Sequence, residues 1–453
     1  MNCESLARDF DAELRKRNAP ACSFIDSPGR GRIYNEGYHE NKLHIQKARG
    51  CYVEDCLGNR YIDTALGAGT HLLGHAHPVV VAAVTEQVQD GSLYINPNLQ
   101  AYQLAERLAA VFPSMDGFVF CNSGSEATMR AARIARAHTG RRKVAVFSGS
   151  WHGGQDLLLV EDDYDSDAAD PRGKLKSAGV PEQVRELTVM LPFNHQAAFD
   201  LIKKHRDELA MVIVEPSQGS NPRDDIQGFL QELRRVTEEH RILLCFDEMI
   251  TGFRIALGGG QQYWGVVPDL ATYGKTLGGG LPFGMLAGKR DIFDTIRGPD
   301  SALPVFMGGT FSANPLLTHV GLKLLAHLVE HEEAVYGELN RRGGLLRAEV
   351  NRGYQACGIP LRMIGVGSFL RLLFTDAPVS SRRDRDRLEL PARLQKLFFN
   401  YLLLHKGINI NSSGVIFLST QHDDQITGEL IAGFLAAGSF FKDALVGEGG
   451  GRS

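Results

Sequence analysis

The sequence has 453 residues, of which 43% are hydrophobic and 23% charged, so it is large enough to bury an extensive core and to divide into at least two lobes. Its 49 Lys and Arg residues against 53 Asp and Glu give a net charge of −4, which predicts no long-range attraction to nucleic acid or anionic membranes. The seven cysteines form no CxxC pair and no stretch resembles a signal peptide or a membrane span. We therefore expect a cytoplasmic protein without a zinc site or disulfide framework.

The first third of the chain combines short strands with helices. Residues 51–63 read as two short strands around a turn, and residues 78–92 and 99–112 have helical periodicity. Residues 118–121 are typical of a short buried strand, and residues 125–139 of a helix that begins at a serine.

Four short apolar runs follow, and helical stretches such as residues 226–240 separate most of them. This alternation predicts a largely parallel sheet covered by helices on both faces. The runs are residues 143–148, 210–216, 242–248 and 285–288.

Beyond about residue 315 the pattern changes to long helices, with strands expected at residues 368–374 and 415–419. We therefore predict an α/β protein with three segments. Residues 1–75 pack with the C-terminal part, residues 76–320 form the large domain, and residues 321–453 form a smaller α+β domain. An arginine-rich stretch with interleaved aspartates, Arg382 to Arg387, is expected to be a solvated face.

Two residues of the central region point to chemistry. Asp247 ends the apolar run Leu243–Phe246, where a carboxylate is costly without a charged partner. Lys275 ends the next apolar run and precedes Gly278, Gly279 and Gly280. A desolvated lysine in glycine-rich surroundings suits Schiff-base chemistry with a flat ligand. Each residue taken alone is more often an ordinary ion pair or surface charge.

The pair predicts a pyridoxal 5′-phosphate (PLP) site. This cofactor needs a lysine for its aldehyde and an acid beside its pyridine nitrogen. Its phosphate needs a cup, and Ser123-Gly124-Ser125 supplies one where a buried strand runs into a helix N-terminus. A plain strand-helix turn is the alternative for that motif.

Ordered blocks from about residue 45 to 325 resemble the class III aminotransferases, in particular the branch that contains glutamate-1-semialdehyde aminomutase. The resemblance implies the PLP-dependent fold type I, with a mostly parallel seven-stranded sheet between helices and a smaller domain formed by both chain ends. The blocks are LGHAHP (73–78), the segment 122–144, WHGG (151–154), IVEP (213–216), FDEMITGFR (246–254), PDLATYGKTLGGG (268–280) and GGTFSANP (308–315).

The resemblance also implies residue roles. Lys275 corresponds to the Schiff-base lysine and Asp247 to the partner of the pyridine nitrogen; both are the expected catalytic residues. Thr310 corresponds to a threonine that reaches the phosphate of the neighbouring subunit, which implies a homodimer with shared active sites. The remaining expected cofactor contacts are the phosphate-cup residues Ser123, Gly124 and Ser125, the stacking aromatic Trp151, the buried acid Glu215, and Met249 on the other ring face.

Three departures from the mutase pattern favour an aminotransferase. An expected N-terminal run is replaced by residues 25–42, where Arg30 and Arg32 are poor substitutes. The pocket segment that usually reads Ser-Trp-Gly is residues 67–69, Gly-Ala-Gly, and Gly414 falls near the position of a mutase glutamate. A wider pocket would suit a bulky oxo-sugar, an antibiotic precursor or a β-keto acid.

The predicted activity is therefore amino transfer from a small donor, L-glutamate being the first candidate, to an aldehyde or ketone. An aminomutase or an epimerase on the same scaffold is the alternative, because it would use the same cofactor residues. Arg254, Arg30 and Arg32 are candidates for binding a substrate carboxylate, and each is equally compatible with a structural role.

Overall fold

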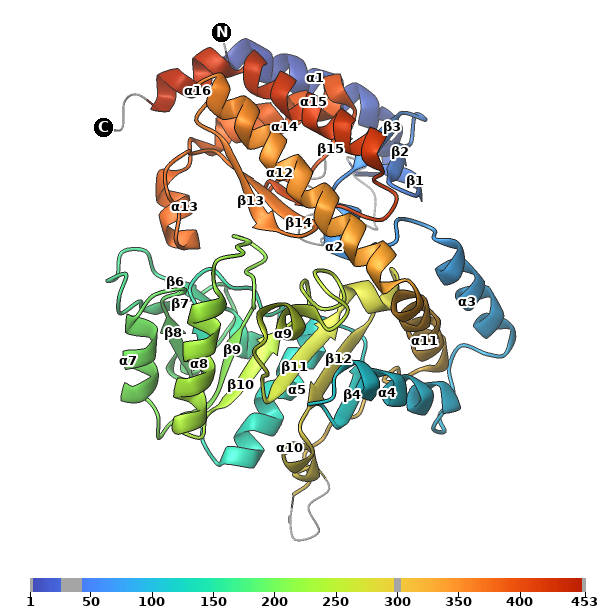
Figure 1. The fold of residues 1–453 in the computed structure, drawn as a ribbon, viewed down its shortest axis with the longest axis vertical. Coiled ribbons are helices and arrows are strands. Elements are labelled where there is room, and N and C mark those ends of the chain that lie inside the picture. The colour runs from blue at the N-terminus through green and yellow to red at the C-terminus, as the bar shows by residue number, and fades with distance from the viewer. Residues whose placement is uncertain (1–2, 26–42, 297–302, 450–453) are drawn as a thin grey trace.

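The computed structural model describes residues 3–25, 43–296 and 303–449. The described chain forms two lobes, and both ends of the chain lie in the upper one in Figure 1. The lower lobe is built on a seven-stranded sheet in the order β4-β12-β11-β10-β9-β5-β8. Its strands are β4 (Gly117–Cys121), β5 (Lys143–Phe147), β8 (Thr188–Leu191), β9 (Leu209–Val214), β10 (Leu243–Asp247), β11 (Leu270–Gly274) and β12 (Gly284–Gly288).

The predicted mostly parallel sheet is confirmed, with β12 as the exception because it runs antiparallel to both β11 and β4. Every residue of β9 is buried, and alternate side chains serve opposite faces. Met211 and Ile213 pack with residues of α5 (Gly124–Thr139), whereas Val212 and Val214 pack with residues of α8 (Gln227–Glu239). Two-sided burial explains why the strands read as continuous apolar runs.

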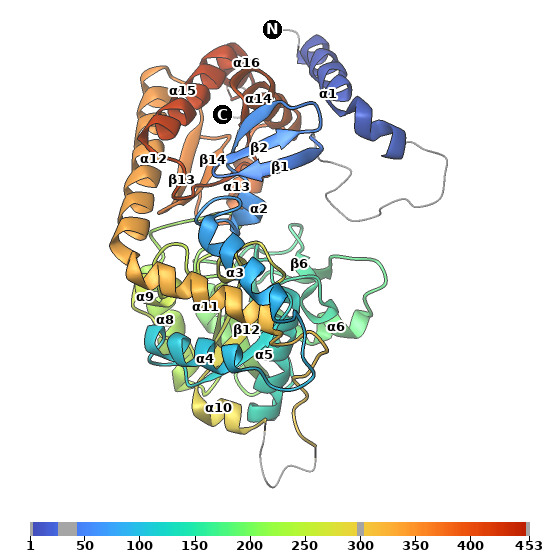
Figure 2. The ribbon, with the colours of Figure 1, turned by 90° about the vertical axis from the view of Figure 1, so that its right-hand side faces the viewer.

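Other helices surround this sheet, and α3, α4 and α11 lie together along one side of the lobe (Figure 2). The helices are α2 (Leu66–Gly69), α3 (Pro78–Gln89), α4 (Leu99–Val111), α6 (Glu182–Glu186), α7 (Ala197–Lys204), α9 (Gly259–Trp264), α10 (Arg290–Asp294) and α11 (Pro315–Glu330). A small hairpin, β6 (Val160–Asp162) with β7 (Gly173–Leu175), and the short helical segments Asp156–Leu158 and Lys275–Gly278 complete the lobe.

The upper lobe contains two further sheets. An antiparallel sheet has the order β13-β14-β16, and a second sheet joins β1, β2 and β3 from the start of the chain to β15 near its end, where Ile62 pairs with Ile408. The strands are β1 (Ile45–Arg49), β2 (Tyr52–Asp55), β3 (Arg60–Asp63), β13 (Arg362–Val366), β14 (Phe369–Leu373), β15 (Ile408–Asn409) and β16 (Val415–Phe417). Strand β3 near the start of the chain thus lies beside β15 near its end.

Helices cover these sheets, and α1 packs on α14 while α12 packs on α15. The helices are α1 (Cys3–Ile25), α12 (Glu338–Ala356) with the preceding π-helical turn Glu333–Gly337, α13 (Arg382–Leu388), α14 (Ala392–Lys406), α15 (Asp424–Phe440) and α16 (Lys442–Gly449). Among the described residues no single helix is long and apolar enough to cross a membrane; one bent pair, Asp424–Phe440 with Lys442–Glu448, passes that test by length and composition only.

Two sequence expectations need correction. The cap of α5 is Ser123, whose side chain accepts a hydrogen bond from the Glu126 amide, so the helix begins before the serine at 125. The arginine-rich stretch forms α13, but it is not simply a solvated face, because Arg383 and Arg385 are only 4% and 5% exposed. Both guanidinium groups bond to backbone carbonyls of the lower lobe, namely those of Tyr164, Ser166, Asp167 and Ser220.

Close backbone packing at Gly284 fixes β12 against the turn that precedes α5. A β-carbon at Gly284 would lie 2.2 Å from the backbone oxygen of Ser123. No side chain fits there unless the strand or the turn moves.

Substituting Gly284→Ala is therefore expected to lower the free energy of unfolding by about 2–3 kcal/mol. Gly228→Ala is the matched control, because Gly228 lies in α8 and a β-carbon there meets nothing within 4 Å. The control should be neutral or slightly stabilising. Urea unfolding of both variants measures the difference, and equal midpoints would contradict the predicted clash.

Candidate functional site

A cavity of about 1060 Å³ lies between the lobes, where the strands of the large sheet end. Asp247 is the last residue of β10, Glu215 directly follows β9, and Lys275 directly follows β11. Parallel neighbouring strands end at the same edge of a sheet, so these residues converge although they are distant in sequence. All three line the cavity.

The Asp247 carboxylate is 2% exposed and hydrogen-bonded on both oxygens. Its Oδ2 lies 2.8 Å from Nδ1 of His152, and its Oδ1 accepts from the Met249 amide at 3.1 Å and from the Thr272 hydroxyl at 3.2 Å. These bonds fix the carboxylate and offset the cost of burying it. The Nε2 atom of His152 is buried without a protein partner.

Lys275 has a backbone φ of 40°, in the left-handed region that non-glycine residues seldom occupy. Such strain concentrates at functional sites. Burial lowers the pKa of the Lys275 amine, and the nearby Arg254 guanidinium acts in the same direction. The carboxylates of Asp247 and Glu215 oppose the shift without cancelling it. The amine is therefore easier to deprotonate than an ordinary lysine.

The N-terminus of α5 opens into the same cavity through Gly124 and Ser125. The Ser125 hydroxyl accepts a hydrogen bond from the Gly154 amide at 2.9 Å. Gly153 lies against this serine with a φ of 92°, and a β-carbon there would lie 2.5 Å from the Ser125 hydroxyl oxygen. Glycines thus bring two backbone segments together around free helix amides, an arrangement that suits an anion.

Trp151, Glu215 and Met249 also line the cavity. Trp151 is 50% exposed, and the Lys176 ammonium lies 4.5 Å from the centroid of its indole ring. Glu215 accepts from the amides of Trp151 and Gly219, and burial raises the pKa of its carboxyl. The sulfur of Met249 occupies space that a β-carbon at Gly124 would fill, since the two would be 2.7 Å apart.

The remaining candidates lie elsewhere. Thr310 is exposed and does not line this cavity. Arg254 is fully buried, and its Nη atoms donate to the carbonyls of Gly69 and Leu418 and to the Ser368 hydroxyl. Because these bonds occupy it, Arg254 is not placed to bind a substrate carboxylate. Arg30 and Arg32 lie outside the described residues.

Sequence reasoning missed several residues of the cavity. His152 belongs to the WHGG motif (151–154), but it was assigned no role from the sequence. Arg371 on β14 also lines the cavity, as do Arg382 and Arg385 of α13. The detectable signal for Arg371 was a charge inside the apolar run Phe369–Phe374, which is costly to bury unless something binds it.

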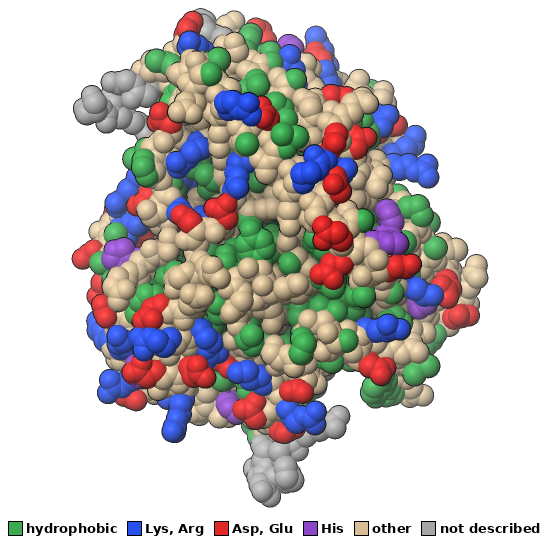
Figure 3. Space-filling model, in the orientation of Figure 1, with side chains coloured by type: hydrophobic (Ala, Val, Ile, Leu, Met, Phe, Trp, Pro, Cys, Tyr) green, Lys and Arg blue, Asp and Glu red, His purple; other side chains and the backbone are tan. Residues whose placement is uncertain are grey.

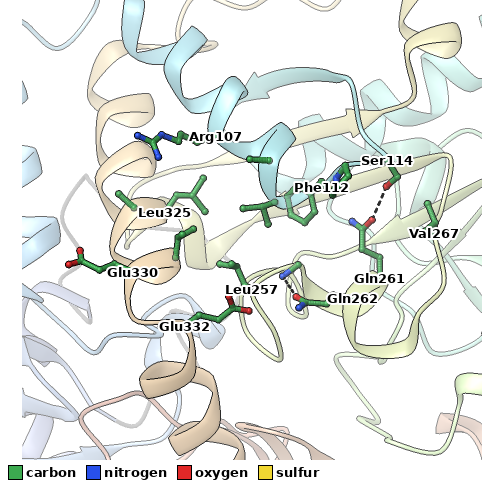
Figure 4. Close-up of a pocket in the computed structure, with 16 residues that line it drawn as sticks. Arg107, Phe112, Ser114, Leu257, Gln261, Gln262, Val267, Leu325, Glu330 and Glu332 are labelled. Atoms are coloured by element: carbon green, nitrogen blue, oxygen red, sulfur yellow. Dashed lines mark hydrogen bonds between the residues drawn. The ribbon is translucent and has the colours of Figure 1, made fainter.

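A second cavity of about 800 Å³ lies between α4, α11 and the loop before α9 (Figure 4). Its lining residues, among them Arg107, Phe112, Leu325 and Gln261, include none of those that line the first cavity. Acidic and basic side chains are interspersed over the face seen in Figure 3. Within the described residues no group of His, Cys, Asp and Glu is placed to hold a metal ion.

Glu248 follows Asp247 in the sequence but does not line the cavity. Its carboxylate accepts from the amides of Gly260 and Gln261 at 2.8 and 2.9 Å and from the Thr251 hydroxyl. Burial is the main reason that the pKa of Glu248 is raised to about 7. The residue thereby holds the start of α9 against the end of β10.

Comparison with known proteins finds a matching family and similar relatives. The model of the family "Aminotransferase class-III" matches residues 33–419. A glutamate-1-semialdehyde 2,1-aminomutase of Methanosarcina acetivorans is 40% identical over 74% of this chain and 78% of that protein.

Two solved structures are also similar. An omega-transaminase from Sphaerobacter thermophilus has a TM-score of 0.83 at 30% identity, covering 94% of this chain and 97% of that one. A β-phenylalanine aminotransferase from Variovorax paradoxus has a TM-score of 0.84 at 29% identity, covering 97% of this chain and 98% of that one.

The raised pKa of Glu248 makes the free energy of unfolding depend on pH. Its folded pKa of about 7 lies above the ordinary 4.5, so the folded state binds the proton more tightly. The stability contributed by the protonated form is present at low pH and is lost as pH rises through 7. Relative to Glu248→Gln, which does not titrate, the wild type should lose up to about 3 kcal/mol between pH 4.5 and 8.

Urea unfolding of both proteins across that range measures the effect. Glu238→Gln, on the exposed surface of α8, is the control for losing a carboxylate. A wild-type advantage that stays constant with pH would contradict the assignment.

Proposed function

The chain belongs to the class III aminotransferase family of PLP-dependent enzymes, and we propose that it transfers an amino group from an amino donor, L-glutamate first, to an aldehyde or ketone. The observation that carries the proposal is the convergence of Lys275, Asp247 and the N-terminus of α5 in one cavity. A lysine, an acid and an anion site are the groups that this cofactor requires.

The residues present fit the cofactor. Gly124 and Ser125 would hold its phosphate on free helix amides, with Ser123 capping the helix. Trp151 would stack on one face of the ring and Met249 would contact the other. Space left by Gly124 and Gly274 accommodates the Met249 sulfur, since a β-carbon at either glycine would lie 2.7 Å from it.

When bound, PLP supplies an aldehyde that captures amines and a ring that draws electrons from the substrate carbon. Asp247, held by His152, would place its carboxylate beside the pyridine nitrogen. Lys275 would hold the cofactor through its aldehyde and would move the proton at the substrate carbon, a role that the lowered pKa of its amine favours. Glu215 lies close enough to influence the Lys275 charge and is itself oriented by two backbone amides.

Features of the cavity support an aminotransferase rather than a mutase. Ala68 lines the wall where an aromatic residue would narrow it, and Asn411 and Ser413 line the region where a mutase carries a glutamate. An opened cavity suits exchange of two substrates in turn. The relatives named as aminomutases favour the second candidate, an aminomutase that needs no external donor.

We further propose a homodimer with shared sites. Arg130 and Arg133 bond to Gly308, Ser312 and Phe306 and so hold the segment around Thr310 on α5. Large apolar side chains in and near this segment are exposed, which is typical of a surface that a partner covers. They are Ile95, Leu99, Tyr102, Leu303, Phe306 and Phe311.

The test of the amino-transfer proposal is a half-reaction followed by absorbance. Adding L-glutamate without an acceptor should convert the PLP form into the pyridoxamine form, with loss of the visible band. Lys275→Ala should abolish turnover without loss of folding, whereas Lys203→Ala, in α7 and outside this cavity, should behave as wild type. An unchanged PLP band with turnover of a single substrate would favour the aminomutase instead.

The shared site predicts complementation between two inactive variants. In a mixed dimer of Lys275→Ala and Thr310→Ala subunits, both defects fall in one site and the other site is intact. Such dimers should recover about half of wild-type activity at limiting PLP, whereas each parent has far less. Mixed dimers isolated with two affinity tags provide the measurement. If Thr310 serves its own subunit, no recovery will occur.

A further inference from the structure

The cavity continues beyond the proposed cofactor contacts into a part walled by the upper lobe. This part is formed by β14, β16, the ends of α13 and α14, and the loop before β16. Its lining residues are Arg371, Arg382, Arg385, Asp386, Glu389, Leu390, Pro391, Ala392, Gln395, Asn411, Ser413, Val415 and Phe417.

Arg371 is placed in this wall by the register of the small sheet. It pairs with Val415, and Phe369 pairs with Phe417. Directly paired residues share a face of the sheet, and Val415 and Phe417 both line the cavity. Arg371 therefore lies on the cavity face of β14.

The Arg371 guanidinium is poorly satisfied by the protein. The residue is 4% exposed, and its Nε is buried without a hydrogen-bond partner. Its Nη2 reaches Glu389 Oε2 only at 3.4 Å. The Glu389 carboxylate also accepts from the Phe374 amide at 3.2 Å and lies 3.4 Å from Nε of Arg385.

The charges of this wall do not balance. Arg371, Arg382 and Arg385 face Asp386 and Glu389, which leaves one positive charge in excess. Burial, followed by the neighbouring Arg385, lowers the pKa of Arg371 to about 10. The group is still protonated at neutral pH and shares the Glu389 carboxylate with Arg385, so an anionic ligand would add a counter-charge to this wall.

We propose that Arg371 binds the carboxylate of the substrate, so that the enzyme acts on amino and oxo acids whose acid group points into the upper lobe. The planar guanidinium matches a carboxylate better than it matches an uncharged group. Gln395, Asn411 and Ser413 add uncharged polar side chains to the lining of the same cavity. The inference rests on the proposed function, because it names the substrate class of that same site.

The experiment compares acids with matched amines in the half-reaction of the PLP-loaded enzyme. β-Alanine and L-glutamate carry carboxylates, and propylamine does not. Arg371→Gln should lower kcat/KM for the two acids by about 30- to 100-fold, mainly through KM, and change the value for propylamine less than about threefold. Arg371→Lys should recover part of the loss.

Arg362→Gln is the matched control. Arg362 lies on the neighbouring strand β13 and its Nε is also buried without a partner, but it does not line this cavity. This variant should keep the wild-type preference for acids. Equal loss on acids and propylamine in Arg371→Gln would indicate a structural role and overturn the proposal, as would no loss on the acids.

A binding measurement separates this inference from the proposed function. Glutarate carries no amine and cannot react. It should raise the Tm of the wild type and of Arg362→Gln but not the Tm of Arg371→Gln. If Arg371→Gln is unstable, Arg371→Lys takes its place, and its Tm should rise less than that of the wild type. An equal rise in wild type and the Arg371 variants overturns the inference even where amino transfer proceeds. If no half-reaction occurs, the proposed function is overturned. The glutarate measurement still shows whether Arg371 binds a carboxylate.

Discussion

The architecture depends on keeping opposite charges together at one edge of the large sheet. Asp247, Glu215 and Lys275 each sit at or directly after the end of a strand, and none would be tolerated there alone. His152 and backbone amides fix the two carboxylates, and the carboxylates in turn limit how far burial lowers the pKa of Lys275. The close packing of Gly284 and Ser123 then holds the N-terminus of α5 beside this group.

Asp247 and Lys275 were predictable from the sequence because each ends an apolar run, whereas Glu215 was expected only from the family resemblance. A strand that is buried on both faces reads as such a run, and a charged residue at its end marks the edge of the sheet. The predicted parallel sheet follows from the same apolar runs, whereas the confirmed family was predicted from the ordered sequence blocks between residues 73 and 315. The roles of the individual cofactor contacts stay predictions, as do the domain boundaries.

Contacts between distant segments were not predictable in the same way. His152 and Asp247 meet across 95 positions, and β3 pairs with β15 between opposite ends of the chain, so no local pattern announces either contact. The burial of Arg383 and Arg385 depends on backbone carbonyls supplied by the lower lobe. An alternation of arginine and aspartate looks the same in sequence whether those carbonyls are present or not.

Arg254 has a mechanical consequence. Its guanidinium joins a carbonyl of the N-terminal segment, at Gly69, to Leu418 and Ser368 of the upper lobe, while its backbone belongs to the loop that follows β10. A fully buried fastening of this kind resists sliding, because translation would break several bonds to a charge at once. Arg254 therefore fixes the N-terminal segment and the upper lobe to the loop after β10 at a single buried position.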